Sequence, residues 1–270
     1  MTDNRFIIDT MRWSFSRLDS FNQCKLGWKK KYIDCEDGES NAFASYGTLQ
    51  HRLHEEYEKG LVDPLALAFE YENRFDNAIP EDFPHNKYTD LRESYFYKGL
   101  EYWENFNPEN LIGNGKIIDS EYKVEFEIDG YPFVGFIDLW VEEDKKNILI
   151  DHKSASISFT KKTKKPTKSS IEKMKHYERQ QYLYSKALID QDIKVDYLAW
   201  NFFNQQMMYK IPWKKSDYEE AIQWALDTIH QIENETEWIE NYDYYYCHNL
   251  CDCRGSCHMT YDCGDDYYEF

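Results

Sequence analysis

The stretch "GFIDLWVEEDKKNILIDHKS", from Gly135 to Ser154, decides the fold and the chemistry expected of this chain. It holds two strand-like runs, and each run carries an aspartate, Asp138 in the first and Asp151 in the second. Adjacent strands would bring both carboxylates to the same end of a sheet, and Lys153 would point to the same face as Asp151. Two converging carboxylates can bind a hard divalent cation, which prefers oxygen ligands, and a neighbouring ammonium can orient or polarise a water on that cation. The pattern therefore indicates metal-assisted phosphodiester hydrolysis. Taken alone, Asp-x-Lys also occurs by chance.

Further strands and helices surround this stretch. The runs at 116–128 and 131–143 are separated by Asp129-Gly130, which predicts a hairpin, and the apolar run at 147–153 predicts a strand buried on both faces. Two more strands are predicted at 194–203 and 206–213, and helices at 14–33, 47–60, 88–106, 171–189 and 216–239. This order predicts one α/β domain over residues 1–270, with a mixed central sheet flanked by helices.

The charge of the chain is uneven. A formal net charge of −18 argues against a general nucleic-acid coat protein, because phosphates would be repelled. The segment from Lys161 to Lys175 nevertheless holds seven lysines and one acid, and it lies largely in a predicted loop at 156–171. This loop is either a solvated surface or a guide for a DNA strand. If it guides DNA, the residues that bind the strand would be Lys161, Lys162, Lys164 and Lys165.

No stretch of 18 apolar residues and no signal peptide is evident, so we expect a cytoplasmic protein without a membrane partner. Thiols stay reduced there, and clustered cysteines more often bind metal than form disulfides. Five of the seven cysteines fall between Cys247 and Cys263. Four thiolates, or thiolates with His248 or His258, would satisfy zinc, and four thiolates would also hold an iron–sulfur cluster.

Five pieces of the sequence, in order, give a resemblance to a known family. They are "SFSRLDSFNQCKLGWKKKY", "GTLQHRLHE", the aspartate-bearing strands "GFIDLW" and "IDHKS", "QQYLY", and the cysteine tail. Together they resemble the PD-(D/E)XK nuclease superfamily, and within it the RecB-like branch that includes CRISPR-associated and AddB-type iron–sulfur exonucleases. The resemblance implies a restriction-endonuclease-like fold and a single nuclease domain.

The resemblance also implies roles for residues. Metal would be held by His51, Asp138 and Asp151 with the carbonyl of His152, and Lys153 would assist the attacking water. Gln180 and Tyr184 would position the DNA strand beside them. Glu121 is a weaker candidate acid. Without the resemblance, His51 would be a surface histidine on an amphipathic helix, and Gln180 and Tyr184 a polar helix edge.

For the tail, the resemblance implies a [4Fe–4S] cluster held by Cys24, Cys247, Cys251 and Cys257, so that a cap at 241–263 closes on the opening helix. Zinc remains the main alternative, and disulfides or free thiols are the other. The gap between Cys247 and Cys251 is three residues where the family usually has two, which leaves Cys253 and Cys263 as alternative ligands. Cys35, just beyond the opening helix, is expected to be structural.

These expectations describe a Mg²⁺- or Mn²⁺-dependent DNA exonuclease that acts on single-stranded ends. Two alternatives remain: a non-cutting subunit with a nuclease-like fold that binds DNA or a partner, and a redox-sensing metalloprotein. The chain has no helicase motif and no phosphate-binding glycine loop, so any motor that it works with, such as a helicase, would be a separate protein.

Overall fold

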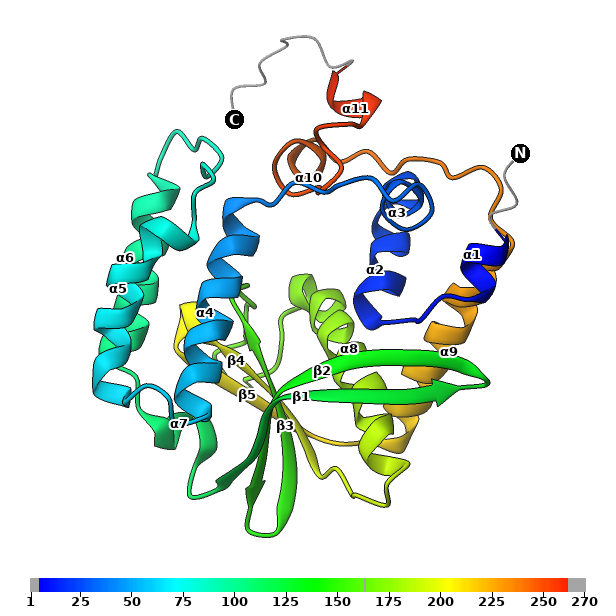
Figure 1. Cartoon of the computed structure of the whole chain (residues 1–270). Coiled ribbons are helices and arrows are strands. Elements are labelled where there is room, and N and C mark those ends of the chain that lie inside the picture. Colours follow the sequence, from blue (N-terminus) through cyan, green and yellow to red (C-terminus); the bar gives the residue numbers. More distant parts are fainter. Residues whose placement is uncertain (1–4, 163, 262–270) are drawn as a thin grey trace.

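A five-stranded mixed sheet forms the centre of the protein in the computed structural model, which describes residues 5–162 and 164–261. The strand order follows the chain (Figure 1). The β1–β2, β2–β3 and β4–β5 pairs are antiparallel, and β3 and β4 are parallel. The strands are β1 (Lys116–Ile128), β2 (Tyr131–Glu143), β3 (Lys146–Lys153), β4 (Tyr197–Phe202) and β5 (Met207–Pro212).

Helices cover both faces of this sheet, which confirms the predicted fold class. The α8 helix (Ile171–Ile189) connects the parallel strands β3 and β4 and packs against α9 (Lys215–Glu233). The α4 helix (Ala42–Glu58) packs on β1 and β2 and against α5 (Leu67–Ala78), which in turn packs on α6 (Leu91–Glu104). The remaining helices are α1 (Arg5–Asp9), α2 (Phe15–Gln23), α3 (Lys25–Tyr32), η1 (Pro64–Ala66), α7 (Pro108–Ile112), η2 (Lys168–Ser170), η3 (Phe203–Gln205), α10 (Tyr244–Asn249) and α11 (His258–Tyr261).

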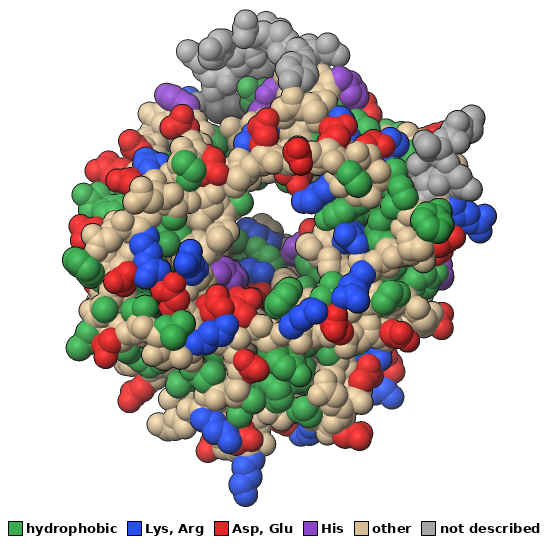
Figure 2. Space-filling view, viewed as in Figure 1, with side chains coloured by type: hydrophobic (Ala, Val, Ile, Leu, Met, Phe, Trp, Pro, Cys, Tyr) green, Lys and Arg blue, Asp and Glu red, His purple; other side chains and the backbone are tan. Residues whose placement is uncertain are grey.

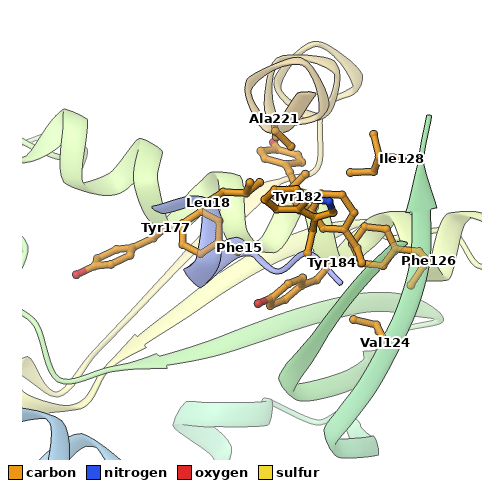
Figure 3. Close-up of a cluster of buried hydrophobic side chains, with 14 of the residues drawn as sticks. Phe15, Leu18, Val124, Phe126, Ile128, Tyr177, Tyr182, Tyr184 and Ala221 are labelled. Carbon is orange, nitrogen blue, oxygen red and sulfur yellow. The ribbon is translucent and has the colours of Figure 1, made fainter. Parts of the chain in front are cut away.

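The hairpin between β1 and β2 forms where Asp129-Gly130 predicts it. Both turn residues have positive φ, 49° at Asp129 and 84° at Gly130, as a tight hairpin turn between twisted strands requires. The hairpin extends from the sheet and packs on α8 (Figure 1). Figure 3 shows the apolar cluster beneath it, where side chains of β1 meet α2, α8 and α9.

Strand β3 lies between two apolar cores, and successive side chains of the strand point alternately into one and the other. Leu149 packs in the core on the α8 side, whereas Ile148 and Ile150 belong to a second core that also holds Leu111 of α7. Five consecutive residues of this strand are buried, which confirms the prediction of burial on both faces. Because side chains alternate along a strand, Asp151 and Lys153 follow Leu149 to the α8 side, and His152 points to the other.

The opening helix predicted at 14–33 is wrong in one respect: two helices form. Ser14 caps α2 as expected, but the backbone of Cys24 is extended, with φ −160° and ψ 113°. Cys24 thereby ends α2 and caps α3, and its thiol accepts a hydrogen bond from the N–H of Gly27 at 3.4 Å. The break takes the cysteine side chain out of the helical repeat and places it at the start of α3.

The C-terminal segment closes the molecule around an opening. The amide of Asn41, in the connection between α3 and α4, donates to the carbonyl of Leu250 at 3.1 Å, and the N–H of Glu39 donates to the carbonyl of Asp252 at 2.8 Å. Lys31 of α3 forms an ion pair of 2.5 Å with Asp252. Figure 2 shows the opening below these contacts, and Figure 1 places α4 on one side of it and α2 on the other.

None of the helices in residues 5–162 and 164–261 is both long enough and apolar enough to cross a membrane.

Candidate functional site

The carboxylates predicted to converge do so at the end of β3. Asp151 is 4% exposed. Its two carboxylate oxygens, Oδ1 and Oδ2, lie 3.0 and 2.9 Å from the ammonium nitrogen of Lys153. Asp138 of β2 accepts a hydrogen bond from the backbone N–H of His152 at 2.8 Å, which ties it to the same strand end. Asp138 and Asp151 line one small pocket between β2, β3 and α8. The alternation that places Asp151 and Lys153 on one face therefore holds.

Helix α4 brings a histidine to this strand end. Nδ1 of His51 lies 3.4 Å from Oδ2 of Asp138, and the ring of His51 meets that of His152 edge-on at 5.8 Å. The His51 side chain is 33% exposed, so one side of it faces solvent. The expectation of a surface histidine without partners does not fit this contact, because the ring lies beside the partly buried carboxylate of Asp138.

Glu121, weighed in the sequence only as a weaker candidate, lies beside these groups. One ligand atom each of His51, Glu121 and Asp138 lies within 4.8 Å of the others. In the β1–β2 register Ser120 pairs with Leu139 and Tyr122 with Ile137, so Glu121 stands opposite Asp138. Glu121 has φ 53°, a conformation that is rare for residues other than glycine and that clusters at functional sites.

Two carboxyl groups of the site resist ionisation. Burial raises the pKa of Glu121 to about 7, and the negative charge of Asp138 adds to that shift. Burial also raises the pKa of Asp151, with Asp138 adding to the shift while the ammonium of Lys153 opposes it. A cation bound between these carboxyl groups would relieve the repulsion between their negative charges and favour their ionised forms. With an imidazole beside carboxylate oxygens, the donor set fits a divalent metal such as Mg²⁺ or Mn²⁺.

Helix α8 supplies the partners of Lys153. The ammonium donates to Oε1 of Gln180 at 3.1 Å and lies 5.1 Å from the centre of the Tyr177 ring. Gln180 and Tyr184 are one turn apart on α8, and Tyr184 borders the same pocket as Asp138 and Asp151. A lone polar helix edge does not account for these contacts. Tyr177, which the sequence did not single out, covers the lysine.

Gly135 makes room for Tyr184. A Cβ added at Gly135 would lie 2.3 Å from the tyrosine ring, which is closer than non-bonded carbon atoms approach. Figure 3 shows the rings of Tyr177 and Tyr184 at the edge of the apolar cluster, with their hydroxyl groups pointing out of it. The glycine of "GFIDLW" thus permits α8 to approach β2 beside Asp138, a role that could be suspected only from the glycine in a strand.

Five of the six described cysteines, all except Cys35, lie at the start of α3 or in the C-terminal segment that contacts it. Burial is the main cause that raises the pKa of Cys247, and the nearby thiols of Cys251, Cys24 and Cys257 raise it further. Burial also raises the pKa of Cys257, and the thiols of Cys251 and Cys24 add to that shift. No disulfide joins any cysteine within the described part of the chain. Cys253 contacts the carbonyl of Gly27 through its thiol at 3.6 Å and lies close to Cys251, and Cys35 is exposed. Cys263 lies outside the described residues.

The lysine-rich loop leaves the end of β3 towards β4 and β5. Its base is closed by backbone hydrogen bonds of 2.8 Å between Thr160 and Lys165 and between Thr167 and Ser158. Phe159 packs against Tyr209 of β5, with ring centres 5.0 Å apart. The side chains at the turn are exposed; they are Lys161, Lys162, Lys164 and Lys165. They extend from the strand end that carries Lys153, on the side away from β2.

Comparison with known proteins places this chain in a family. The family model of the PD-(D/E)XK nuclease superfamily matches residues 12–258. The fold is similar to that of a candidate exonuclease from Eubacterium rectale, known from a crystal structure, with a TM-score of 0.54, 14% sequence identity and 98% of each chain covered. No curated protein matches the sequence. The match over nearly the whole chain, together with the strand-end carboxylates, shows that the chain belongs to the PD-(D/E)XK nuclease superfamily.

Proposed function

We propose that this protein is a Mg²⁺- or Mn²⁺-dependent deoxyribonuclease of the RecB-like branch, acting as an exonuclease on single-stranded DNA ends. The observation that carries the proposal is the meeting of Asp138, Asp151 and Lys153 at one strand end, with His51 and Glu121 beside Asp138. Membership of a nuclease superfamily gives the reaction class, and the site residues of this chain give the chemistry.

In this proposal Asp138, Asp151, His51 and the carbonyl of His152 hold the cation, and Glu121 lies within reach of it. A divalent cation bound there would neutralise charge on the scissile phosphate and lower the pKa of a bound water. Lys153 is held by Asp151 and Gln180, so its ammonium is fixed where it can orient that water. Gln180 and Tyr184 would position the DNA strand along α8.

The ring-like closure of the molecule supports a preference for single-stranded ends. The opening in Figure 2 lies above the sheet and between α4 and α2, and α4 carries His51. The contacts of Asn41 and Glu39 with the C-terminal segment close it on the far side from the sheet. A strand that passes through a closed opening has to enter by a free end, which is how an exonuclease meets its substrate.

The four exposed lysines at the turn of the 156–171 loop are proposed to guide the strand to or from this site. They form the densest positive run in a chain of net charge −18, so they would attract phosphates locally without general binding to nucleic acid. A strand handed over by a separate helicase would reach them already unwound.

We propose that Cys24, Cys247, Cys251 and Cys257 hold a [4Fe–4S] cluster that makes 241–263 a cap on the opening helix. The position of Cys24 at the start of α3, and the effect of the thiols of Cys24 and Cys251 on the pKa of Cys247 and of Cys257, support this set. Cys253 and zinc remain the competing ligand and metal, because Cys253 lies beside Cys251. Such a cluster would fasten the closure of the ring, and the residues 1–270 would then act as a single nuclease domain.

The test is a cleavage assay on protein purified without oxygen. End-labelled linear single-stranded, linear double-stranded and circular single-stranded DNA are incubated with Mg²⁺, Mn²⁺ or EDTA. Lys153→Ala is compared with Lys146→Ala, which removes the lysine at the opposite end of the same strand. The same preparations are analysed for iron and zinc.

We expect cleavage of linear single strands that needs the cation, falls at least about 100-fold in Lys153→Ala and is unchanged in Lys146→Ala. Circular single strands should resist. Equal loss in both variants, or no cleavage by the unaltered protein, would contradict the nuclease proposal. Cutting of circles would contradict only the preference for ends, and zinc without iron would contradict only the cluster.

A further inference from the structure

A buried polar cluster lies directly beneath the proposed metal site. His54 and Glu58 are three and seven residues beyond His51, so all three lie on one side of α4. Nε2 of His152 lies 2.9 Å from one carboxylate oxygen of Glu58, and the hydroxyl of Ser120 donates to the other at 2.7 Å. The His152 and Glu58 side chains are each 1% exposed. Helix α4 and strands β1 and β3 are thus joined through a single carboxylate.

The ring of His152 is held at three points. Besides Glu58, its Nδ1 lies 3.1 Å from the side-chain amide of Asn201 on β4, which also donates to the hydroxyl of Tyr102 at 2.9 Å. On one face the ring of His54 stacks on it, with centres 3.8 Å apart and planes within 11°. Both ring nitrogens of His152 therefore have a hydrogen-bond partner, and a buried ring held in this way keeps one orientation.

This geometry does not suit a second metal ion, although His54, Glu58 and His152 offer three ligand atoms close together. A metal binds imidazole in the plane of the ring. The two rings are stacked and nearly parallel, so one ion cannot lie in both planes. The cluster is built from hydrogen bonds and ring contact, and its function has to be sought in what it holds.

What it holds is the main chain between the two catalytic side chains of β3. His152 lies between Asp151 and Lys153, and its backbone N–H donates to Oδ2 of Asp138. Its side chain points away from theirs, so fixing the ring fixes the strand end without occupying the site. His51 and Glu58 both lie on α4, so the contact that anchors Glu58 to β3 also fixes the position of His51 beside Asp138.

We infer that Glu58 is a positioning residue for the metal site: by anchoring the His152 ring to α4, it sets the spacing of His51, Asp138, Asp151 and Lys153. This inference rests on the proposed function, since it assigns Glu58 a role towards the cation proposed there. Residues behind the direct ligands typically change metal affinity about 10- to 100-fold when they are removed.

The experiment compares Mn²⁺ affinity, measured by electron paramagnetic resonance of free Mn²⁺, with the melting temperature of metal-free protein. The variants are Glu58→Ala, Glu58→Gln and the control Glu72→Gln, an exposed glutamate of α5. Glu58→Gln can still accept from His152 and donate to Ser120, so it retains the positions of both partners. We expect Glu58→Ala to weaken Mn²⁺ binding about 10- to 100-fold, with recovery in Glu58→Gln to within about threefold of the unaltered protein.

Glu58→Ala with unaltered Mn²⁺ affinity would overturn the inference even if its melting temperature falls, because a purely structural residue gives that result. If Glu58→Ala does not fold, Ser120→Ala replaces it; a weakening of several fold is then expected, and none would overturn the inference. Absence of Mn²⁺ binding by the unaltered protein is a separate outcome, and it would contradict the proposed function itself.

Discussion

Asp151 and His152 are neighbours in the chain, yet they serve opposite sides of β3. The sequence predicted the side that carries Asp151 and Lys153, because alternation along a strand is local, and Asp138 joins them because β2 pairs with β3. It did not predict that Glu58 would meet His152, since that contact joins residues 94 apart. The stripe of His51, His54 and Glu58 along one helix was the available signal, because polar residues rarely line a buried helix face without partners.

Gly135→Ala tests the close approach of α8 to β2. The added methyl would lie 2.3 Å from the ring of Tyr184, so ring and helix must move, and overpacking of this kind lowers the free energy of unfolding by about 1–3 kcal/mol. Urea denaturation followed by circular dichroism measures the change. We also expect weaker DNA binding, because Tyr184 leaves its place beside Asp138.

Gly47→Ala is the matched control for that experiment. Gly47 lies within α4, and a Cβ there would meet no atom within 4 Å. Replacing glycine by alanine inside a helix raises stability by about 1 kcal/mol. The two variants should therefore shift the unfolding midpoint in opposite directions. A midpoint that rises in Gly135→Ala as it does in Gly47→Ala would mean that Gly135 does not make room for Tyr184.

At the scale of elements, local signals located all five strands of the sheet. The bounds of the hairpin strands agree with the sequence prediction because Asp129-Gly130 and the alternation of apolar residues are short-range signals. The helix break at Cys24 was missed, since its cap is a thiol rather than the hydroxyl or carboxylate that usually marks a helix start. Helix α5 was missed too, although Leu67, Tyr71 and Phe75 recur at helical spacing and are all buried.

Glu178 makes the packing of α8 against α9 sensitive to pH. Burial raises its pKa from 4.5 to about 7, and the charges of Asp217 and Glu220 on α9 add to this shift. Above pH 4.5 the unfolded chain loses this proton while the folded protein keeps it. Stability therefore falls as pH rises from 4.5 to 7, and the loss is complete above pH 7.

Glu178→Gln removes that ionisation. We expect the variant to melt at a higher temperature than the unaltered protein at pH 8, with a smaller difference at pH 5, as measured by differential scanning calorimetry. A difference that does not depend on pH would show that the carboxyl of Glu178 ionises as freely in the folded protein as in the unfolded chain.

At the scale of the whole molecule, the two ends of the chain close on each other. The family resemblance implied that Cys24 meets the C-terminal cysteines, and this pairing stays a prediction. In the structure the thiol of Cys253 contacts the carbonyl of Gly27 in α3, the helix that Cys24 caps, at 3.6 Å. The opening that results could not be predicted, because it depends on how the connection after α3 meets the C-terminal segment. Helix α4, which carries His51, lies along one side of this opening, and the C-terminal segment closes it (Figure 1).

The most direct test of the central claim is the location of manganese in crystals of the unaltered protein, found by anomalous scattering at the manganese absorption edge. The account predicts a manganese peak among the side chains of Asp138, Asp151 and His51, and loss of that peak in Asp151→Asn crystals. A peak only among His54, Glu58 and His152, or no manganese in well-ordered crystals at saturating concentration, would contradict it.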